Sequence, residues 1–336
     1  MKRIIECVPN YSEGRDRAVI DAIVAAIASV PDVRVLNVDP GQAANRTVVT
    51  FVGPPEAVVE AAFRGSATAQ ERIDMRRHTG THPRIGATDV LPLVPVEGVT
   101  LEECAELARS LAKRMYEELG IPCYCYEAAA FKPARRNLAV CRAGEYEGLK
   151  EKMEDPERRP DFGGAWDETA ARSGASVVGA RNFLIAVNFN LDSTDAVAAG
   201  EVARDVRESG RKGPDGSRIP GPLKGCKAIG WYIEEYGIAQ VSMNITDMDA
   251  TPLHVAFETV RKAAAARGLR VTGTEIIGLV PERVLLEAGR YFRQQRGLPA
   301  DAAPEELVRL AVEAMGLDDL RPFDPREKVI EYKMME

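Results

Sequence analysis

The order of apolar segments repeats along the chain, and this repeat limits the folds that the chain can adopt. The first half contains, in order, a strand at 3–9, a helix at 15–29, strands at 33–39 and 46–53, and a helix that starts at Pro54 or Pro55. The second half contains a strand at 182–190, a helix at 193–207, strands at 225–234 and 238–245, and a helix at 252–267. The spacing of apolar residues separates the helices from the strands. The strand–helix–strand–strand–helix order, found twice, predicts an α/β (α+β) protein with two similar ferredoxin-like subdomains.

Further elements extend both halves. They are a strand at 89–96, a helix at 100–119 ending at Gly120, a strand at 121–128, helices at 282–295 and 304–315, and an extended tail. Thr251 is the expected N-cap of the 252–267 helix, with Pro252 as its first residue. The charged, glycine-containing stretch 145–178 predicts a surface linker. The predicted subdomains are therefore residues 1–178, which include this linker, and residues 179–336.

Composition narrows the functional class. A net charge of −7 over 336 residues, with no long basic run, argues against general nucleic-acid binding. No apolar stretch reaches the roughly 20 residues of a membrane span, and Glu6 stands too early for a signal peptide. Among the six cysteines there is no C-x-x-C pair, and a strand would direct Cys123 and Cys125 to one face. We therefore expect a cytoplasmic protein with buried, reduced thiols.

The segment from Arg77 to Asp89 carries two of the three histidines of the chain. Pro83 favours an extended backbone at His82, and Gly80 and Gly86 allow turns on either side of it, which together predict a loop. The i, i+4 spacing of His78 and His82 also fits a zinc-binding helix, but glycine and proline argue against a helix here. No metal site is therefore expected. His82 is either a catalytic base, since imidazole titrates near neutral pH, or a histidine that only braces the loop.

The segment 207–224 is rich in glycine, proline and basic residues. It is either a solvated loop or a mobile cover that brings cations to an anionic ligand.

Several strings of residues resemble the formiminotransferase domain of glutamate formiminotransferases. They run in order over most of the chain: E-C-V-P-N-Y-S-E-G from Glu6, N-R-T-V from Asn45, T-F-V-G from Thr50, H-P-R-I-G-A-T-D-V from His82, R-P-D-F-G from Arg159, G-A-R from Gly179, K-A-I-G-W-Y from Lys227, A-Q-V-S from Ala239 and G-L-V-P from Gly278. Gly164 departs from the family, which often has proline there. The resemblance implies two α/β subdomains with a ligand groove between them, and dimerisation through this domain.

The resemblance also implies a reaction. Family members transfer the formimino group of N-formimino-L-glutamate to N5 of tetrahydrofolate, the co-substrate, and release L-glutamate. In animals a cyclodeaminase domain follows; here any cyclisation would need a separate protein. Histidine breakdown is the implied pathway, and the folate could be polyglutamylated.

His82 matches the family's catalytic histidine, and one imidazole could take a proton from the folate nitrogen and give one to the departing nitrogen. A carboxylate is expected to orient it, with Asp39 as the first candidate and Asp89 as the alternative. Arg46 and Arg84 are expected to bind substrate carboxylates.

Two further segments carry candidate binding residues. Asn10, Ser12 and Glu13 lie at a strand-to-helix turn whose N–H groups can face an anion, unless Ser12 only caps the helix. The folate-binding stretch that the resemblance implies comprises Phe162, Gly163, Gly164, Ala165, Trp166, Asp167, Glu168, Thr169, Ala170, Ala171 and Arg172. In it, Phe162 or Trp166 could stack on a pterin ring. His254 is expected to be structural.

Three other functions compete with this reaction. They are folate-dependent formyl transfer to or from glutamate, folate binding without turnover, and metal-dependent hydrolysis by His78, His82 and Asp89. A formyl donor differs from a formimino donor by one oxygen in place of one nitrogen, which the sequence does not reveal.

Overall fold

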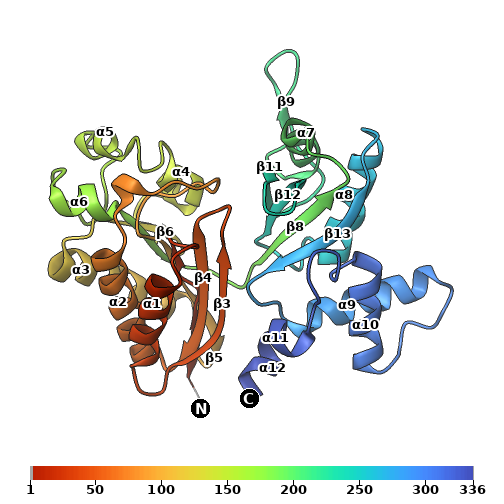
Figure 1. Cartoon of the computed structure of the whole chain (residues 1–336), viewed down its shortest axis with the longest axis horizontal. Coiled ribbons are helices and arrows are strands. Elements are labelled where there is room, and N and C mark those ends of the chain that lie inside the picture. The colour runs from red at the N-terminus through yellow and green to blue at the C-terminus, as the bar shows by residue number, and fades with distance from the viewer. Residues whose placement is uncertain (1–2, 336) are drawn as a thin grey trace. The chain divides into compact units, whose positions relative to one another are not determined.

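The computed structural model describes residues 3–335, which divide into two units between Asn182 and Phe183 (Figure 1). The boundary lies four residues beyond the expected one at 178. The reason is strand β7 (Ser176–Ala180), which pairs with strands of the first unit and therefore keeps this stretch in that unit.

The first unit is built on a seven-stranded sheet. Its strands are β1 (Ile4–Cys7), β2 (Asn10–Tyr11), β3 (Arg34–Gly41), β4 (Arg46–Gly53), β5 (Thr88–Glu97), β6 (Cys123–Glu127) and β7. The order is β3, β4, then β1 and β2 together, then β5, β7 and β6. β1 and β2 act as one strand interrupted at Pro9, which lacks the N–H that a ladder needs. The pairs β5–β7 and β7–β6 are parallel, and the others are antiparallel.

Helices cover both faces of this sheet. The long helices α1 (Arg17–Ala28), α2 (Pro55–Arg72) and α3 (Leu101–Leu119) share one hydrophobic core with it. The short helices α4 (Leu138–Arg142), α5 (Leu149–Glu154) and α6 (Glu168–Ser173) contribute to a second core, against β5, β6 and β7. β6 feeds both cores by alternation, since Cys123 and Cys125 point to the first core and Tyr124 and Tyr126 to the second. Both cysteines lie on one face, as predicted, and all six thiols are buried and free.

The second unit contains a four-stranded antiparallel sheet. Its successive elements are β8 (Ile185–Leu191), α7 (Ala196–Val206), β11 (Cys226–Ile233), β12 (Ile238–Ile245), α8 (Leu253–Ala265) and β13 (Val271–Ile277). The strand order is β11, β12, β8, β13. Helices α9 (Glu282–Gln295) and α10 (Pro304–Met315) pack on each other, and both contribute to the hydrophobic core that the sheet forms with α7 and α8. Among residues 3–335, no helix is long and apolar enough to cross a membrane.

The same strand order occurs in both units and confirms the predicted repeat. In the first unit, β3, β4, the β1–β2 pair and β5 stand in the places that β11, β12, β8 and β13 occupy in the second. Each repeat closes with one more strand, β5 or β13, which gives the full βαββαβ order of a ferredoxin-like fold. β6 and β7 are an extension of the first sheet.

Several local predictions were wrong. The stretch 145–178 is no surface linker, because it contains α5, α6 and the start of β7 and contributes Leu149 and Met153 to a core. β13 was missed, and the tail is helical at α11 (Pro325–Lys328) and α12 (Ile330–Met335) rather than extended.

The expected cap of α8 was also wrong. Pro252 is the N-cap residue of this helix, and the Thr251 hydroxyl donates to the Lys224 carbonyl instead. The basic segment 207–224 forms a small hairpin of β9 (Arg211–Lys212) and β10 (Arg218–Ile219), whose strands are exposed.

Candidate active site

The segment from His78 to Ala87 is a loop without helical turns, as predicted. It follows a single 3-10 turn, η1 (Met75–Arg77), and is fastened to the turn between β3 and β4. The Asn45 side chain donates to the Thr79 carbonyl at 2.9 Å, and His78 Nε2 donates to the Asn45 carbonyl at 2.8 Å. The Thr81 N–H adds a bond to the Ala43 carbonyl at 3.2 Å. These bonds hold the loop in place, although the loop has no regular secondary structure of its own.

The two glycines of the loop are needed for close approach of backbones. A Cβ added at Gly80 would lie 2.2 Å from the Ala44 carbonyl oxygen, and one at Gly86 would lie 2.2 Å from that of Ala175. Neither glycine has the positive φ of a glycine-specific turn. Both glycines are therefore needed in the loop, but for close approach of backbones and not for the predicted turns. Gly86 packs against Ala175, the residue before β7.

His82 has a defined tautomer. Its Nδ1 lies 2.7 Å from the Pro83 carbonyl oxygen, which can only accept a hydrogen bond. Nδ1 therefore carries the proton of the neutral ring, and the basic lone pair is on Nε2. Burial, then the positive charges of Arg46 and Arg142, hold the pKa of His82 well below its usual 6.5, although Asp89 and the bond to Pro83 oppose them. The imidazole is thus neutral at physiological pH, the form that can accept a proton.

Asp89 is the centre of a buried charge cluster beside this loop. Its Oδ2 accepts hydrogen bonds from Arg46 Nη1 and, at 2.5 Å, from Arg142 Nη2, while Oδ1 accepts from the Ile85 N–H at 2.8 Å. Asn10 Oδ1 accepts from Arg46 Nε at 3.0 Å. The side chains of Arg46, Asp89 and Arg142 are only 9%, 0% and 14% exposed. Two guanidinium groups share one carboxylate, so the cluster keeps one excess positive charge.

The pKa shifts of the cluster reflect this imbalance. Burial, opposed by Asp89, lowers the pKa of Arg46 to about 10. Burial alone would raise the pKa of Asp89, but Arg142 and Arg46 outweigh it and hold that pKa below 3.8. The Nε of Arg142 is buried and has no hydrogen-bond partner among the described residues. The cluster is therefore suited to attract an anion.

Arg142 is the residue of this cluster that sequence reasoning missed. It ends α4, whose last carbonyls at Val140 and Cys141 accept hydrogen bonds from the buried ammonium group of Lys152. Lys152 thereby fixes the end of the helix from which Arg142 reaches Asp89. No local pattern distinguishes Arg142 from other arginines, because its partner is 53 residues away.

The two candidates for orienting His82 stand differently in the structure. Asp89 acts on the ring through its charge, and the hydrogen bond of Nδ1 goes to a backbone carbonyl. Asp39 lies in β3, paired in register with Val48 of β4. Its role as the orienting acid stays a prediction.

The turn before α1 is already occupied by carboxylates of the chain. Asp16 is the N-cap of α1 and accepts from the N–H groups of residues 18 and 19, so Ser12 is not the cap. Glu13 accepts from the N–H groups of Arg15 and Asp16 at 2.7 and 2.8 Å. Ser12 instead donates to the Gly86 carbonyl at 2.7 Å and fastens the loop. The N–H groups of Arg15 and Asp16 are therefore taken by Glu13, and the binding role of Asn10, Ser12 and Glu13 stays a prediction.

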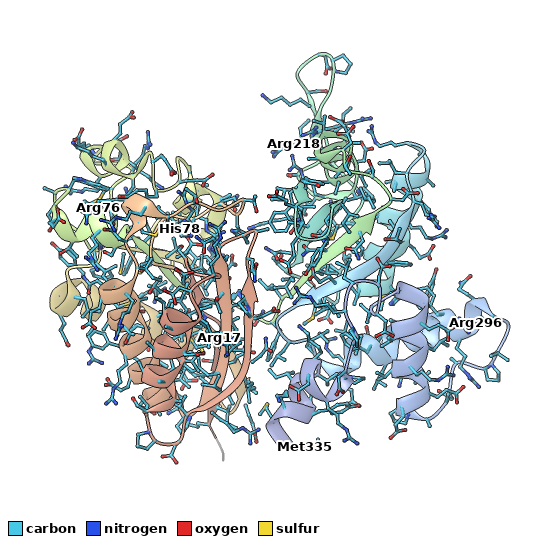
Figure 2. The ribbon with its side chains drawn as sticks, in the orientation of Figure 1. Arg17, Arg76, His78, Arg218, Arg296 and Met335 are labelled. Atoms are coloured by element: carbon cyan, nitrogen blue, oxygen red, sulfur yellow. The ribbon has the colours of Figure 1, made fainter. Side chains whose placement is uncertain are left out.

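Arg84 lies in a cavity of about 500 Å³ whose other lining residues are 78–80, Gly144, Glu145 and Glu147. Its guanidinium group contacts Glu147 at 2.7 and 2.5 Å and Glu145 at 3.2 Å. Its Nε donates to His78 Nδ1 at 3.2 Å. Figure 2 labels His78 in the first unit, near one end of β3 and β4. Arg84 is thus already paired, which the sequence did not reveal.

The predicted folate-binding stretch lies in the same unit. Phe162 packs edge-to-face on Phe131, with ring centroids 5.9 Å apart, and Trp166 packs on Tyr146 at 6.2 Å. Gly163 is half-buried, and Gly164 and Ala165 are exposed. Asp167 caps α6, which holds the residues from Glu168 through Thr169, Ala170 and Ala171 to Arg172.

Hydrogen bonds tie this stretch to its surroundings, among them those between Phe162 and Cys123 and from the Tyr146 hydroxyl to the Ala171 carbonyl. Arg172 donates to the carbonyls of Gln70 and Glu71. The Tyr146 N–H donates to the Arg84 carbonyl at 3.0 Å, which links the ring partner of Trp166 to the Arg84 cavity. The contacts bring His82, Arg46, Arg84 and Trp166 into one region of the first unit, where the binding role of the stretch remains a prediction.

Two other expectations concern His254 and a bound metal ion. His254 stacks on Tyr291, with ring centroids 4.6 Å apart, in the second unit. Within residues 3–335, no group of three or more His, Cys, Asp or Glu side chains is placed to hold a metal ion.

Comparison with known proteins gives two family matches that together span the chain. Residues 4–181 match the N-terminal subdomain of the formiminotransferase domain, and residues 186–335 match the formiminotransferase domain. The chain is 42% identical over 294 residues to the glutamate formimidoyltransferase of Streptococcus pyogenes serotype M1, covering 88% of this chain and 94% of that protein. It is also 42% identical over 296 residues to that of Thermoplasma acidophilum, covering 88% and 93%.

A longer relative shares the same region. The chain is 47% identical over 332 residues to the mouse formimidoyltransferase-cyclodeaminase, covering 99% of this chain and 60% of the mouse protein. The chain therefore spans about three fifths of the length of that relative. The chain belongs to the formiminotransferase family, with both subdomains of the formiminotransferase domain.

Proposed function

We propose that this protein transfers the formimino group of N-formimino-L-glutamate to N5 of tetrahydrofolate and releases L-glutamate. The observation that carries the proposal is 42% identity, over nearly their full length, to two proteins named glutamate formimidoyltransferase. The neutral histidine next to a buried cationic cluster supplies the chemistry that this reaction needs.

His82 acts as the base and then as the acid. N5 of tetrahydrofolate attacks the formimino carbon, and the new carbon–nitrogen bond gives a tetrahedral intermediate whose N5 carries an extra proton. Nε2 of His82 takes this proton and donates it to the glutamate nitrogen. The bond from carbon to that nitrogen then breaks, and the product is the N5-formimino folate. A histidine with a lowered pKa suits the first step, because its ring is neutral before attack.

The excess positive charge of Arg46 and Arg142 serves two purposes in this proposal. It disfavours a protonated His82 in the resting enzyme, and it attracts the carboxylates that both substrates carry. Asp39 contributes to the orientation of the imidazole in this scheme. Burial of the cluster strengthens its field, since water screens it less than on the surface.

Tetrahydrofolate binds, in this proposal, along the stretch from Phe162 to Arg172. Aromatic side chains provide faces on which a pterin ring stacks, and Trp166 is one side chain there that is only partly buried. We further propose that the protein works as a cytoplasmic homodimer in histidine degradation and accepts polyglutamylated folate. The resemblance to the family supports these points.

A direct turnover assay tests the proposal. Purified protein is incubated with tetrahydrofolate and either N-formimino-L-glutamate or N-formyl-L-glutamate, and the folate product is identified by mass spectrometry. The proposal predicts N5-formimino-tetrahydrofolate from the first donor. Product from the formyl donor alone would replace it with formyl transfer, and no product from either donor would favour a folate-binding protein.

A further inference from the structure

The cavity around Arg84 has a chemical character of its own. Its volume of about 500 Å³ lies within the range of about 300–1,000 Å³ that small-molecule sites occupy. Its lining residues come from the loop 78–84 and from the segment 144–147, which both belong to the first unit. The cavity therefore forms within one unit.

The charged groups of the lining do not balance. Glu145 and Glu147 face the single guanidinium group of Arg84. His78 adds no charge, because burial and the nearby Arg84 lower its pKa and both ring nitrogens are hydrogen-bonded. Two carboxylates and one cation leave the lining with one net negative charge. This net negative charge favours a ligand that carries a cationic group.

The carboxylates are the accessible part of the cavity. The side chain of Arg84 is only 9% exposed, whereas those of Glu145 and Glu147 are 43% and 65% exposed. Each carboxylate has more lone pairs than its bonds to Arg84 use, so it can accept further hydrogen bonds. The buried guanidinium group holds both oxygens of Glu147 and Oε2 of Glu145 in position, and a ligand would bind to the remaining lone pairs of these carboxylates.

The backbone of this segment is built for that arrangement. Glu145 has a φ of 53°, a left-handed conformation that few residues other than glycine adopt, and it follows Gly144 with a φ of 86°. Hydrogen bonds from the Gly148 N–H to Gly144 and from the Tyr146 N–H to Arg84 close the turn. A strained residue held by its surroundings is typical of functional sites.

We propose that Glu145 and Glu147 bind the cationic formamidinium group of the donor and make the site select a formimino donor over a formyl donor. This inference rests on the proposed function, because it names the part of the same site that reads the donor group. An amidine is a strong base, so it is protonated at neutral pH and presents planar N–H groups, as a guanidinium group does. Carboxylates bind such planar cations through paired, charge-assisted hydrogen bonds.

A formyl donor lacks these features. Its amide is neutral, and it presents an oxygen where the amidinium presents an N–H. That oxygen would face a carboxylate oxygen, and neither atom can donate. Sites built to bind an N–H reject an analogue without it, because polar groups of the site are left unpaired. Glu145 and Glu147 thus supply the discrimination between the two donors.

Equilibrium binding tests this inference without turnover. Calorimetry measures the affinities of N-formimino-L-glutamate and N-formyl-L-glutamate for the parent protein, Glu145→Gln, Glu147→Gln and the control Glu151→Gln, an exposed glutamate on α5. We expect the parent and the control to prefer the formimino donor. Each site variant should lose about 10- to 100-fold of that preference, the contribution of a hydrogen bond to a charged group.

The preference is measured as a ratio because either substitution also changes the charge around Arg84. Both donors carry the same carboxylates, so the effect of the lost charge on those carboxylates cancels in the ratio, and the remaining change reports the cationic donor group. Far-ultraviolet circular dichroism confirms that each variant is folded. An unchanged ratio in both site variants overturns the inference.

The outcomes separate this inference from the proposed function. Transfer by the parent protein with unchanged ratios in the variants refutes the role of the glutamates and leaves the function standing. Binding that depends on Glu145 and Glu147, without any folate product, supports the inference and refutes the function.

Discussion

Replacing Asp89 by asparagine should destabilise the first unit strongly. The change removes the carboxylate that is bonded to both Arg46 and Arg142, while the amide oxygen can still accept the Ile85 N–H. Two guanidinium groups, 9% and 14% exposed, are then left without a counter-charge from Asp89. Removing one partner of a buried ion pair costs about 3–5 kcal/mol, and we expect a loss in this range for Asp89→Asn.

Urea unfolding with tryptophan fluorescence measures this loss in the right unit. Of the two tryptophans, Trp166 lies in the first unit and Trp231 in the second, so a Trp231→Phe background reports the first unit alone. Asp32→Asn is the matched control, because Asp32 is exposed and its φ of 64° suits asparagine equally well. The control should change the free energy of unfolding by less than about 0.5 kcal/mol.

The excess charge of the cluster also predicts an energetic coupling between Asp89 and Arg142. Asp89→Asn combined with Arg142→Met removes one of the two uncompensated charges, so the double variant should recover about 1–3 kcal/mol relative to additive losses. If Asp89→Asn unfolds at the parental urea concentration, the excess-charge description of the cluster is refuted.

Three further predictions concern neighbouring features. Burial raises the pKa of Glu6 from 4.5 to about 7, against the opposing charge of Arg181, so the folded state loses stability as pH rises from about 4.5 to 7. Glu6→Gln should remove this loss of about 3 kcal/mol at pH 8 and change the stability little at pH 4. Urea titrations at the two pH values measure both effects. Arg142→Gln removes a positive charge that suppresses protonation of the His82 ring, the proposed base, so the acid limb of the pH profile of kcat/KM should move to higher pH, and an unmoved limb would contradict the electrostatic role. Gly86→Ala places a Cβ 2.2 Å from a backbone oxygen and should destabilise by about 1–3 kcal/mol in thermal unfolding, whereas Gly41→Ala, with its nearest atom at 3.6 Å, should be close to neutral.

The regular elements with strong local signals were predicted from the sequence almost to the residue. Helices 282–295 and 304–315 have the predicted bounds, as do strands 46–53 and 238–245. Amphipathic spacing and a proline at or just before the first helical residue mark the helices, and both signals are local. The left-handed cap at Gly120 was predicted for the same reason.

The missed elements lack such signals. β13 contains Gly273, which weakens a strand pattern. It is defined by its antiparallel pairing with β8, a segment about 85 residues earlier in the chain. β7 has five residues, all buried, and is recognisable only by its position between β5 and β6. Pairing between distant segments, which local patterns do not encode, decides both strands.

The candidate site divides in the same way. The segment around His82 was predicted to be a loop from its glycines and proline and is a loop, although its glycines serve close backbone approach and do not turn the chain. The links from Asp89 to Arg142 and from Arg84 to Glu145 and Glu147 join residues 53 to 63 positions apart. These links depend on α4 and the segment after it folding back over the first sheet, and no spacing rule in the sequence predicts them.

In the proposed mechanism, His82 is the group that moves the proton between the two nitrogens. Single-turnover transfer from N-formimino-L-glutamate to tetrahydrofolate should be about 10²- to 10⁴-fold slower in His82→Gln than in the parent protein, with the fold and the affinity for folate retained. The same substitution at His254, in the second unit, should leave the rate unchanged. A folded His82→Gln protein that transfers the group at the parental rate would contradict the account.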